Sequence, residues 1–163
     1  MSPISNLHPQ NPSSPPTPRL TPNSPASKPC IVEELSDLPD KVVKISSGGY
    51  ATAALTSGND VYIWGRQGYP ELSEPLPGSP TPLDMDGMEF LDLAVGMNHL
   101  IVLTTEWKVF VVGAGGNGQL GLGVAIKELE DWKEVNLSLK EGQRVVSVHA
   151  GYKNSFLIVE NVT

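Results

Sequence analysis

One glycine-rich segment combines residue types and a spacing that could bind a nucleotide cofactor. Gly116-Asn-Gly-Gln-Leu-Gly121 matches the fingerprint G-x-G-x-x-G, and Glu141 lies twenty residues beyond it. In dinucleotide-binding domains this pattern places a pyrophosphate at a helix N-terminus and an acidic side chain on a ribose hydroxyl. Gly121 and Gly123 would both fall inside that helix, where each glycine costs about 1 kcal/mol relative to alanine. We therefore interpret the segment as a structural turn and predict no cofactor.

The other candidates for catalysis or metal binding are three histidines and one cysteine. His8, His99 and His149 show no metal-ligand spacing, and Cys30 is the single cysteine. His99 could act as an acid or base, but it lies between Asn98 and an apolar run with no carboxylate or nucleophile nearby in sequence. We predict that His99 is buried and hydrogen-bonded, and that the chain has neither a catalytic residue nor a metal site.

The sequence contains three copies of one repeated unit, and the elements of this unit would position the glycine-rich segment and His99. They read VVKISSGGYATAALTSGNDVYIWG (42–65), FLDLAVGMNHLIVLTTEWKVFVVG (90–113) and VVSVHAGYKNSFLIVENVT (145–163). Aligned on Gly48, Gly96 and Gly151, the copies recur after 48 and 55 residues, and Gly65 and Gly113 keep the 48-residue offset. A fixed period of this length is typical of an architecture built from repeated units.

Each unit predicts a short apolar strand before its aligned glycine and a second strand after it, at 53–55, 100–103 and 156–159. The first two units add a third strand, at 61–64 and 109–112, that is apolar throughout and suits burial on both faces. A weaker fourth strand is predicted before each unit, at 31–35, 83–85 and 132–137. Four strands in about 50 residues indicate an all-β propeller blade packed between neighbours. The aligned glycines would lie at sharp turns, where they allow a positive φ or a close approach of backbone.

The second unit continues into the run GNGQLGLG and carries G-x-x-H at Gly96–His99, while the first unit ends in VYIWG. This combination resembles the signature of the regulator of chromosome condensation repeat. The resemblance assigns structural roles to ten signature residues, namely Gly48, Gly65, Gly96, His99, Gly113, Gly118, Gln119, Leu120, Gly121 and Gly151. Two copies depart from the signature at the position of His99, where the first has Ala51 and the third has Asn154. In the first copy Pro70-Glu-Leu-Ser73 also stands at the position of Gly118–Gly121.

The resemblance implies a closed ring of seven blades, whereas this sequence holds two full repeats and the first two strands of a third. The expected units are about 42–89, 90–144 and 145–163. An incomplete ring would leave the apolar lateral faces of its end blades in water. We therefore expect the remaining blades to come from another chain or from a longer parent protein.

The first 30 residues differ in composition from the rest of the chain. They are rich in proline and serine, and their only charged side chains are Arg19 and Lys28. Such a segment cannot bury enough apolar surface to offset the entropy of ordering it, so we predict a disordered tail followed by a repeat region at 31–163. We find neither a secretory signal nor a membrane-spanning stretch, and the single cysteine favours a reducing compartment. An intracellular protein, cytoplasmic or nuclear, is expected, and a mitochondrial location is less favoured.

The net charge of −7 argues against direct binding to nucleic acid, whose phosphates require clustered basic residues. We therefore predict a protein partner and a non-catalytic interaction scaffold rather than an enzyme. Trp107, between Glu106 and Lys108 at a predicted turn, is the candidate interaction residue. The resemblance implies an alternative, a guanine nucleotide exchange factor, or a fragment of one, for a small GTPase of the Ran type.

Overall fold

The computed structural model describes residues 29–65, 76–123 and 125–162. The chain divides into Met1–Val32 and Glu33–Thr163, and every described helix and strand lies in the second part. The predicted disordered tail, 1–30, and the segment Pro70–Ser73 lie outside the described residues, except for positions 29 and 30. The described part contains ten strands and one helical turn, α1 (Glu33–Ser36), so the prediction of an all-β fold is confirmed.

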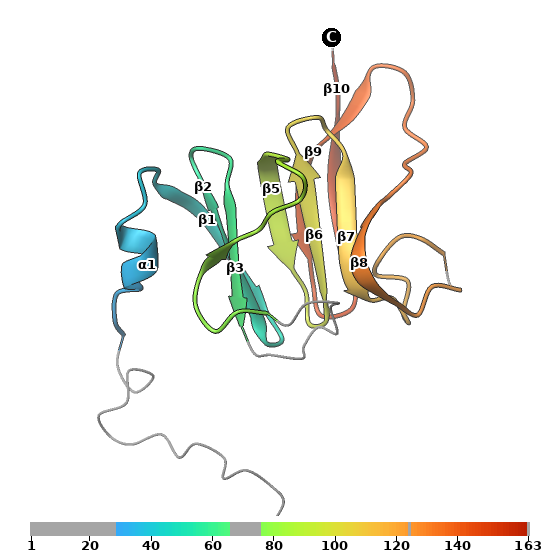
Figure 1. Ribbon diagram of the computed structural model, residues 1–163. Coiled ribbons are helices and arrows are strands. Elements are labelled where there is room, and N and C mark those ends of the chain that lie inside the picture. Colours follow the sequence, from blue (N-terminus) through green and yellow to red (C-terminus); the bar gives the residue numbers. More distant parts are fainter. Residues whose placement is uncertain (1–28, 66–75, 124, 163) are drawn as a thin grey trace, which may run out of the picture. The chain divides into compact units, whose positions relative to one another are not determined.

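The strands form three antiparallel sheets, which we call blades 1, 2 and 3 (Figure 1). Blade 1 has the order β1-β2-β3-β4, with β1 (Val42–Gly48), β2 (Ala51–Thr56), β3 (Val61–Gly65) and β4 (Thr81–Pro82). Blade 2 repeats this order with β5 (Phe90–Val95), β6 (His99–Thr104), β7 (Val109–Ala114) and β8 (Glu128–Glu134). Blade 3 contains β9 (Gln143–Ala150) and β10 (Ser155–Asn161). The three repeat units therefore fold as two complete blades and the first two strands of a third.

The fourth strands differ from the prediction. No strand forms over 31–35, where α1 carries Glu33 and Glu34 in its only turn. β4 lies just before the predicted 83–85 and is two residues long; Pro82 has no N–H to donate, and beyond it the N–H of Leu83 donates to the carbonyl of Val61 in β3 at 2.8 Å. β8 begins earlier than the predicted 132–137, and five of its seven residues are exposed and charged, so its apolar signal is weak.

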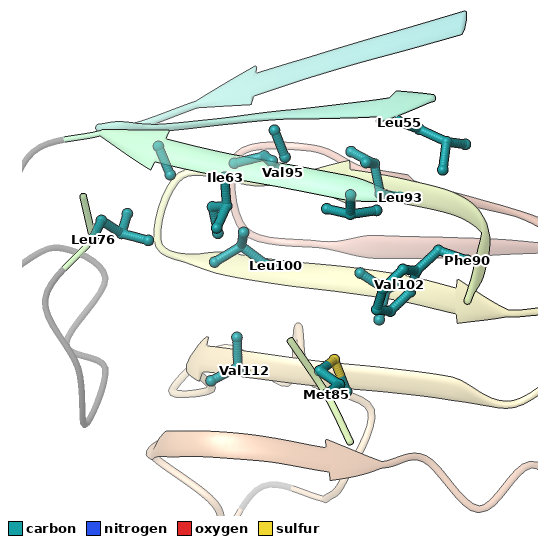
Figure 2. Close-up of a cluster of buried hydrophobic side chains, with 13 residues drawn as sticks. Leu55, Ile63, Leu76, Met85, Phe90, Leu93, Val95, Leu100, Val102 and Val112 are labelled. Carbon is teal, nitrogen blue, oxygen red and sulfur yellow. The ribbon is translucent and has the colours of Figure 1, made fainter. Parts of the chain in front are cut away.

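Apolar side chains fill the space between successive blades. Between blades 1 and 2, residues of β2 and β3 such as Leu55 and Ile63 pack against Leu93, Leu100 and Val102 of blade 2 (Figure 2). A second cluster lies between blades 2 and 3. Both faces of blade 2 are thus covered, and all six residues of β6 are buried.

The first strand of each blade, β1, β5 or β9, which we call the innermost strand, contains a β-bulge at the same position of the repeat. The pairing register skips Val43 in β1, Leu91 in β5 and Val146 in β9. A bulge adds one residue to one strand and changes the direction of the side chains that follow. The next residue in each strand is Lys44, Asp92 or Ser147, and these three equivalent positions form the junction described below.

Candidate functional site

The carboxylate of Asp92 joins all three blades. Lys44 Nζ of blade 1 donates to Oδ1 at 2.6 Å, and Ser147 Oγ of blade 3 donates to Oδ2 at 2.6 Å. The backbone N–H of Val148 also donates to Oδ2, at 2.9 Å. Lys44, Asp92 and Ser147 each lie four residues before the aligned glycine of their repeat, so equivalent positions of successive blades meet here.

The surroundings of Asp92 favour its charged form. Burial alone would raise the pKa of this carboxyl group, but the hydrogen bonds from Lys44, Ser147 and Val148 outweigh burial and hold the pKa below its ordinary value. Asp92 is therefore a buried, fully bonded carboxylate that holds blades together. Alignment of the three repeats places Lys44, Asp92 and Ser147 in one column, a signal that sequence reasoning missed.

His99 joins blade 2 to blade 3. Its ring is buried, and Nε2 lies 3.0 Å from Ser155 Oγ on β10. The Ser155 hydroxyl donates its hydrogen to the backbone carbonyl of Gln119 at 2.8 Å, so it accepts from Nε2–H of His99. Burial lowers the pKa of His99, and a hydrogen bond with the Asn154 backbone opposes this effect only in part.

The glycine-rich run that matched the cofactor fingerprint folds as successive turns rather than as the start of a helix. The N–H of Gly118 donates to the carbonyl of Gly115 at 2.8 Å, and Gly121 N–H to the carbonyl of Gly118 at 3.0 Å. Gly118 and Gly121 have φ angles of 82° and 68°. The side chains of Gln119 and Leu120 are buried, and Leu120 belongs to the cluster between blades 2 and 3.

The aligned glycines lie where neighbouring groups approach closely. A Cβ atom on Gly96 would overlap the ring of His99, and one on Gly48 would overlap the carbonyl oxygen of Gly96 in the next blade. At Gly151 the neighbour is the side chain of Asn154. The closing glycines Gly65 and Gly113 pair with Ala51 and His99 across their sheets. These signature positions therefore serve contacts within and between blades.

One end of the blades carries a hollow bordered by acidic residues, which we call the acidic face. It consists of the β2–β3 turn, the β6–β7 turn and the link from Asp84 to Glu89. The hollow measures about 300 Å³ and is lined by Asp86, Gly87, Met88, Glu89, Thr104, Thr105 and Glu106. The opposite end, with the β1–β2, β5–β6 and β9–β10 turns, has a hollow of about 370 Å³ beside Tyr152.

Trp107 stands in the β6–β7 turn of the acidic face with a backbone conformation that suits it poorly. Its φ is +64°, in the left-handed region, and its side chain is 39% exposed. The equivalent residue of blade 1 is Asn59, with φ +67°, and asparagine tolerates this conformation far better. The guanidinium of Arg144, from blade 3, lies over the indole ring 3.9 Å from its centroid. From the sequence we predicted Trp107 as an interaction residue and did not consider Arg144, which is distant in the chain.

Within the described residues, no group of three or more His, Cys, Asp or Glu side chains is placed to hold a metal ion. No helix in those same ranges is long and apolar enough to cross a membrane.

Comparison with known proteins identifies the repeat. A family model described as "Regulator of chromosome condensation (RCC1) repeat" matches residues 42–69. Residues 42–69 belong to the regulator of chromosome condensation repeat family. It is 39% identical over 92 residues to the Regulator of chromosome condensation of Drosophila melanogaster, which covers 54% of this chain and 17% of that protein. It is 29% identical over 132 residues to the E3 ubiquitin-protein ligase HERC2 of Homo sapiens, covering 77% of this chain and 3% of that protein.

Two solved structures share the fold. Prp20p from Saccharomyces cerevisiae aligns with a TM-score of 0.65 at 20% identity, over 77% of this chain and 33% of that one. Human WBSCR16 aligns with a TM-score of 0.61 at 18% identity, over 75% of this chain and 32% of that one. The chain thus spans about a third of the length of these structures, and its sheets are β-propeller blades of this repeat type in an incomplete ring.

Proposed function

We propose that this chain is a non-catalytic protein-interaction scaffold that binds a basic protein segment at the acidic face. The observation that carries this proposal is Trp107. An exposed aromatic residue in the left-handed region costs stability, and residues held in such conformations cluster at functional sites. Arg144 stacks on the ring and restrains it, which suits a residue that contacts a partner.

The charge of the surrounding surface supports a basic partner. Asp86, Glu89 and Glu106 line the hollow in the acidic face, where Glu106 forms an ion pair with Lys108 at 2.7 Å, and Met88 adds an exposed apolar side chain. An aromatic anchor next to a charged rim is a common arrangement at protein interfaces. The structural neighbour Prp20p is described with binding properties to Gsp1p and histones, and histones are a basic class of protein that can serve as a probe here.

Calorimetric titration of the full chain with purified core histones tests the acidic face. We expect the double variant D86K/E106K to bind at least tenfold more weakly, because two carboxylates at the hollow become ammonium groups. The matched control is E33K/E34K, which makes the same change of charge on α1 and should bind within about threefold of the wild type. Equal weakening by both pairs would show that only net charge matters, and absence of binding by the wild type would reject the proposal.

Trp107→Asn separates binding from stability. Since Asn59 occupies the equivalent turn of blade 1, the substitution relieves the left-handed tryptophan and loses one cation–π contact of about 0.5–1 kcal/mol. We expect the free energy of unfolding to change by less than about 1 kcal/mol, while histone affinity falls about tenfold. Unchanged affinity would remove Trp107 from the interface. Tyr152→Ala, at the opposite end of the blades, is the control for an exposed aromatic residue.

A second candidate is guanine nucleotide exchange on a Ran-type small GTPase. It is favoured by the 36–39% identity to proteins named Regulator of chromosome condensation, each matched over about a fifth of its length. Exchange requires only that a surface bind the nucleotide-free GTPase more tightly than the loaded one. Release of a fluorescent GDP analogue from such a GTPase should accelerate when the chain is added if this candidate is right. Binding without accelerated release would favour the scaffold.

We also propose a repeat region at 31–163 and an intracellular location, cytoplasmic or nuclear. One relative, 38% identical over 84 residues, is the "RCC1 domain-containing protein RUG3, mitochondrial" of Arabidopsis thaliana. Imaging of the tagged full chain in living cells tests the location.

A further inference from the structure

The two outermost blade faces of the described chain expose apolar side chains at positions that are buried elsewhere in the repeat. On blade 3, Phe156 is 57% exposed and Ile158 is 49% exposed. On blade 1, Ile45 is 60% exposed. Exposed side chains of this size, gathered on sheet faces, mark surfaces that associate with another protein surface.

Comparison of the repeats indicates which kind of surface fits the outer face of blade 3. Phe156 and Ile158 are equivalent to Ile101 and Leu103 of blade 2, which are only 2% and 0% exposed. Ile101 and Leu103 are buried because they pack in one cluster with Val148 of β9, the innermost strand of the next blade. The surface that fits Phe156 and Ile158 is therefore the innermost strand of another blade.

The outer face of blade 1 is such a surface. Ile45 of β1 is equivalent to Leu93 of β5 and to Val148 of β9, which are 1% and 0% exposed. Leu93 packs on the preceding blade 1, and Val148 packs on the preceding blade 2. Ile45 is the one member of this series that has no preceding blade in the described chain. The two exposed faces are thus the complementary halves of one repeated interface.

We propose that blade 3 of one copy of this chain binds blade 1 of a second copy, with β1 of the second copy packed on β9 and β10 of the first. The contact continues the interfaces already present between blades 1 and 2 and between blades 2 and 3. It joins two different faces, so it is a head-to-tail contact that either extends into an open row of copies or closes into a ring.

The two-strand length of blade 3 does not prevent this contact. Between blades 1 and 2, β5 contacts β1 and β2, which are the first two strands of the preceding blade. Between blades 2 and 3, β9 likewise contacts β5 and β6. Blade 3 has both corresponding strands, β9 and β10, so it presents the strands against which an innermost strand packs.

Sedimentation velocity of the full chain and of two single-face variants tests the proposal. The wild type should increase in mass with concentration beyond the dimer. Ile158→Glu removes the blade 3 face and Ile45→Glu removes the blade 1 face, so each variant alone should be monomeric. An equimolar mixture of the two should form a dimer and stop there, because each variant retains the one face that the other has lost.

Matched controls separate the interface from general effects of a new charge. Leu139→Glu places the same charge at an exposed leucine in the β8–β9 link and should associate like the wild type. Thermal unfolding of each variant checks that it folds, and Ile158→Ser with Ile45→Ser replaces any variant that does not. A wild type that stays monomeric at all concentrations would overturn the proposal. So would a mixture that stays monomeric, since that result requires a symmetric contact or none.

Discussion

Asp92 shows how one ionised side chain can stabilise a repeat fold. Its two oxygens accept hydrogen bonds from Lys44 in blade 1 and from Ser147 and Val148 in blade 3. A buried carboxylate contributes to stability only when its hydrogen-bonding capacity is met, and here the partners come from both neighbouring blades. Loss of this group would leave donors on two blades without their acceptor.

We predict that Asp92→Asn lowers the free energy of unfolding by about 2–3 kcal/mol. The asparagine amide is neutral, so Lys44 loses its ion pair. Its NH2 group would also face Lys44, or Ser147 and Val148, all of which donate hydrogen bonds to the carboxylate of Asp92. Denaturant unfolding measures the loss. The matched control, Asp60→Asn, changes an exposed aspartate and should have an effect within about 0.5 kcal/mol. Equal stability of the two variants would contradict the role given to Asp92.

His99 makes stability depend on pH. Because burial lowers its pKa, the unfolded chain binds a proton at higher pH than the folded chain does. The contribution of neutral His99 to the free energy of unfolding is complete above the ordinary histidine pKa of about 6.5. It is lost as the pH falls through the pKa of His99 in the folded chain. Asp92, whose pKa is also lowered, adds a second loss of stability below its ordinary value, near pH 4 and lower.

Measurement of the unfolding temperature between pH 8 and pH 3 tests this dependence. We expect His99→Asn, which copies Asn154 of blade 3, to abolish the decrease that begins near pH 6.5 and to keep the one below pH 4. His149→Asn makes the same substitution at an exposed histidine and should preserve both decreases. A decrease near pH 6.5 that persists in His99→Asn would assign it to another group.

At the scale of elements, the strands that carry the repeat signature were predictable and the outer strands were not. The first three strands of a blade have apolar residues and a turn glycine at fixed local spacing, which sequence alone reveals. β4 is two residues long and β8 is mostly exposed, so neither has an apolar pattern to detect. The contacts of Asp92 and the stacking of Arg144 on Trp107 also join residues from different blades, which no local pattern encodes.

The signature turns should tolerate a methyl group only where there is space for it. Gly96→Ala would place its Cβ against the buried ring of His99, so we predict a loss of about 1–3 kcal/mol in the free energy of unfolding. Gly116→Ala, in the glycine-rich run of the same blade, meets no atom within 4 Å and should change stability by less than about 0.5 kcal/mol. A harmless Gly96→Ala would show that the close approach is not required.

At the scale of the whole described molecule, blade 2 is the most enclosed part because it has a neighbour on each face. All residues of β6 are buried, whereas β10 is largely exposed. We expect amide hydrogen exchange to be slowest in β6 and at least a hundredfold faster in β10 of the monomer, since local opening of β10 exposes little additional apolar surface. Exchange measured by mass spectrometry on peptic peptides tests this order, and equal protection of both strands would contradict it.

The bulges at Val43, Leu91 and Val146 help to predict where insertions and deletions can occur in a chain built from such repeats. From bulge to closing glycine, the first two repeats have the same number of residues, and the seven additional residues of the 55-residue spacing all fall after Gly113. A residue added or removed within the paired part of an inner strand, by contrast, would shift the pairing by one and exchange the two faces of the strand beyond the change, so that residues such as Asp92 and Leu93 could not both keep their contacts. Insertions and deletions should therefore accumulate in the outer part of each blade, and the inner three strands should keep a constant length.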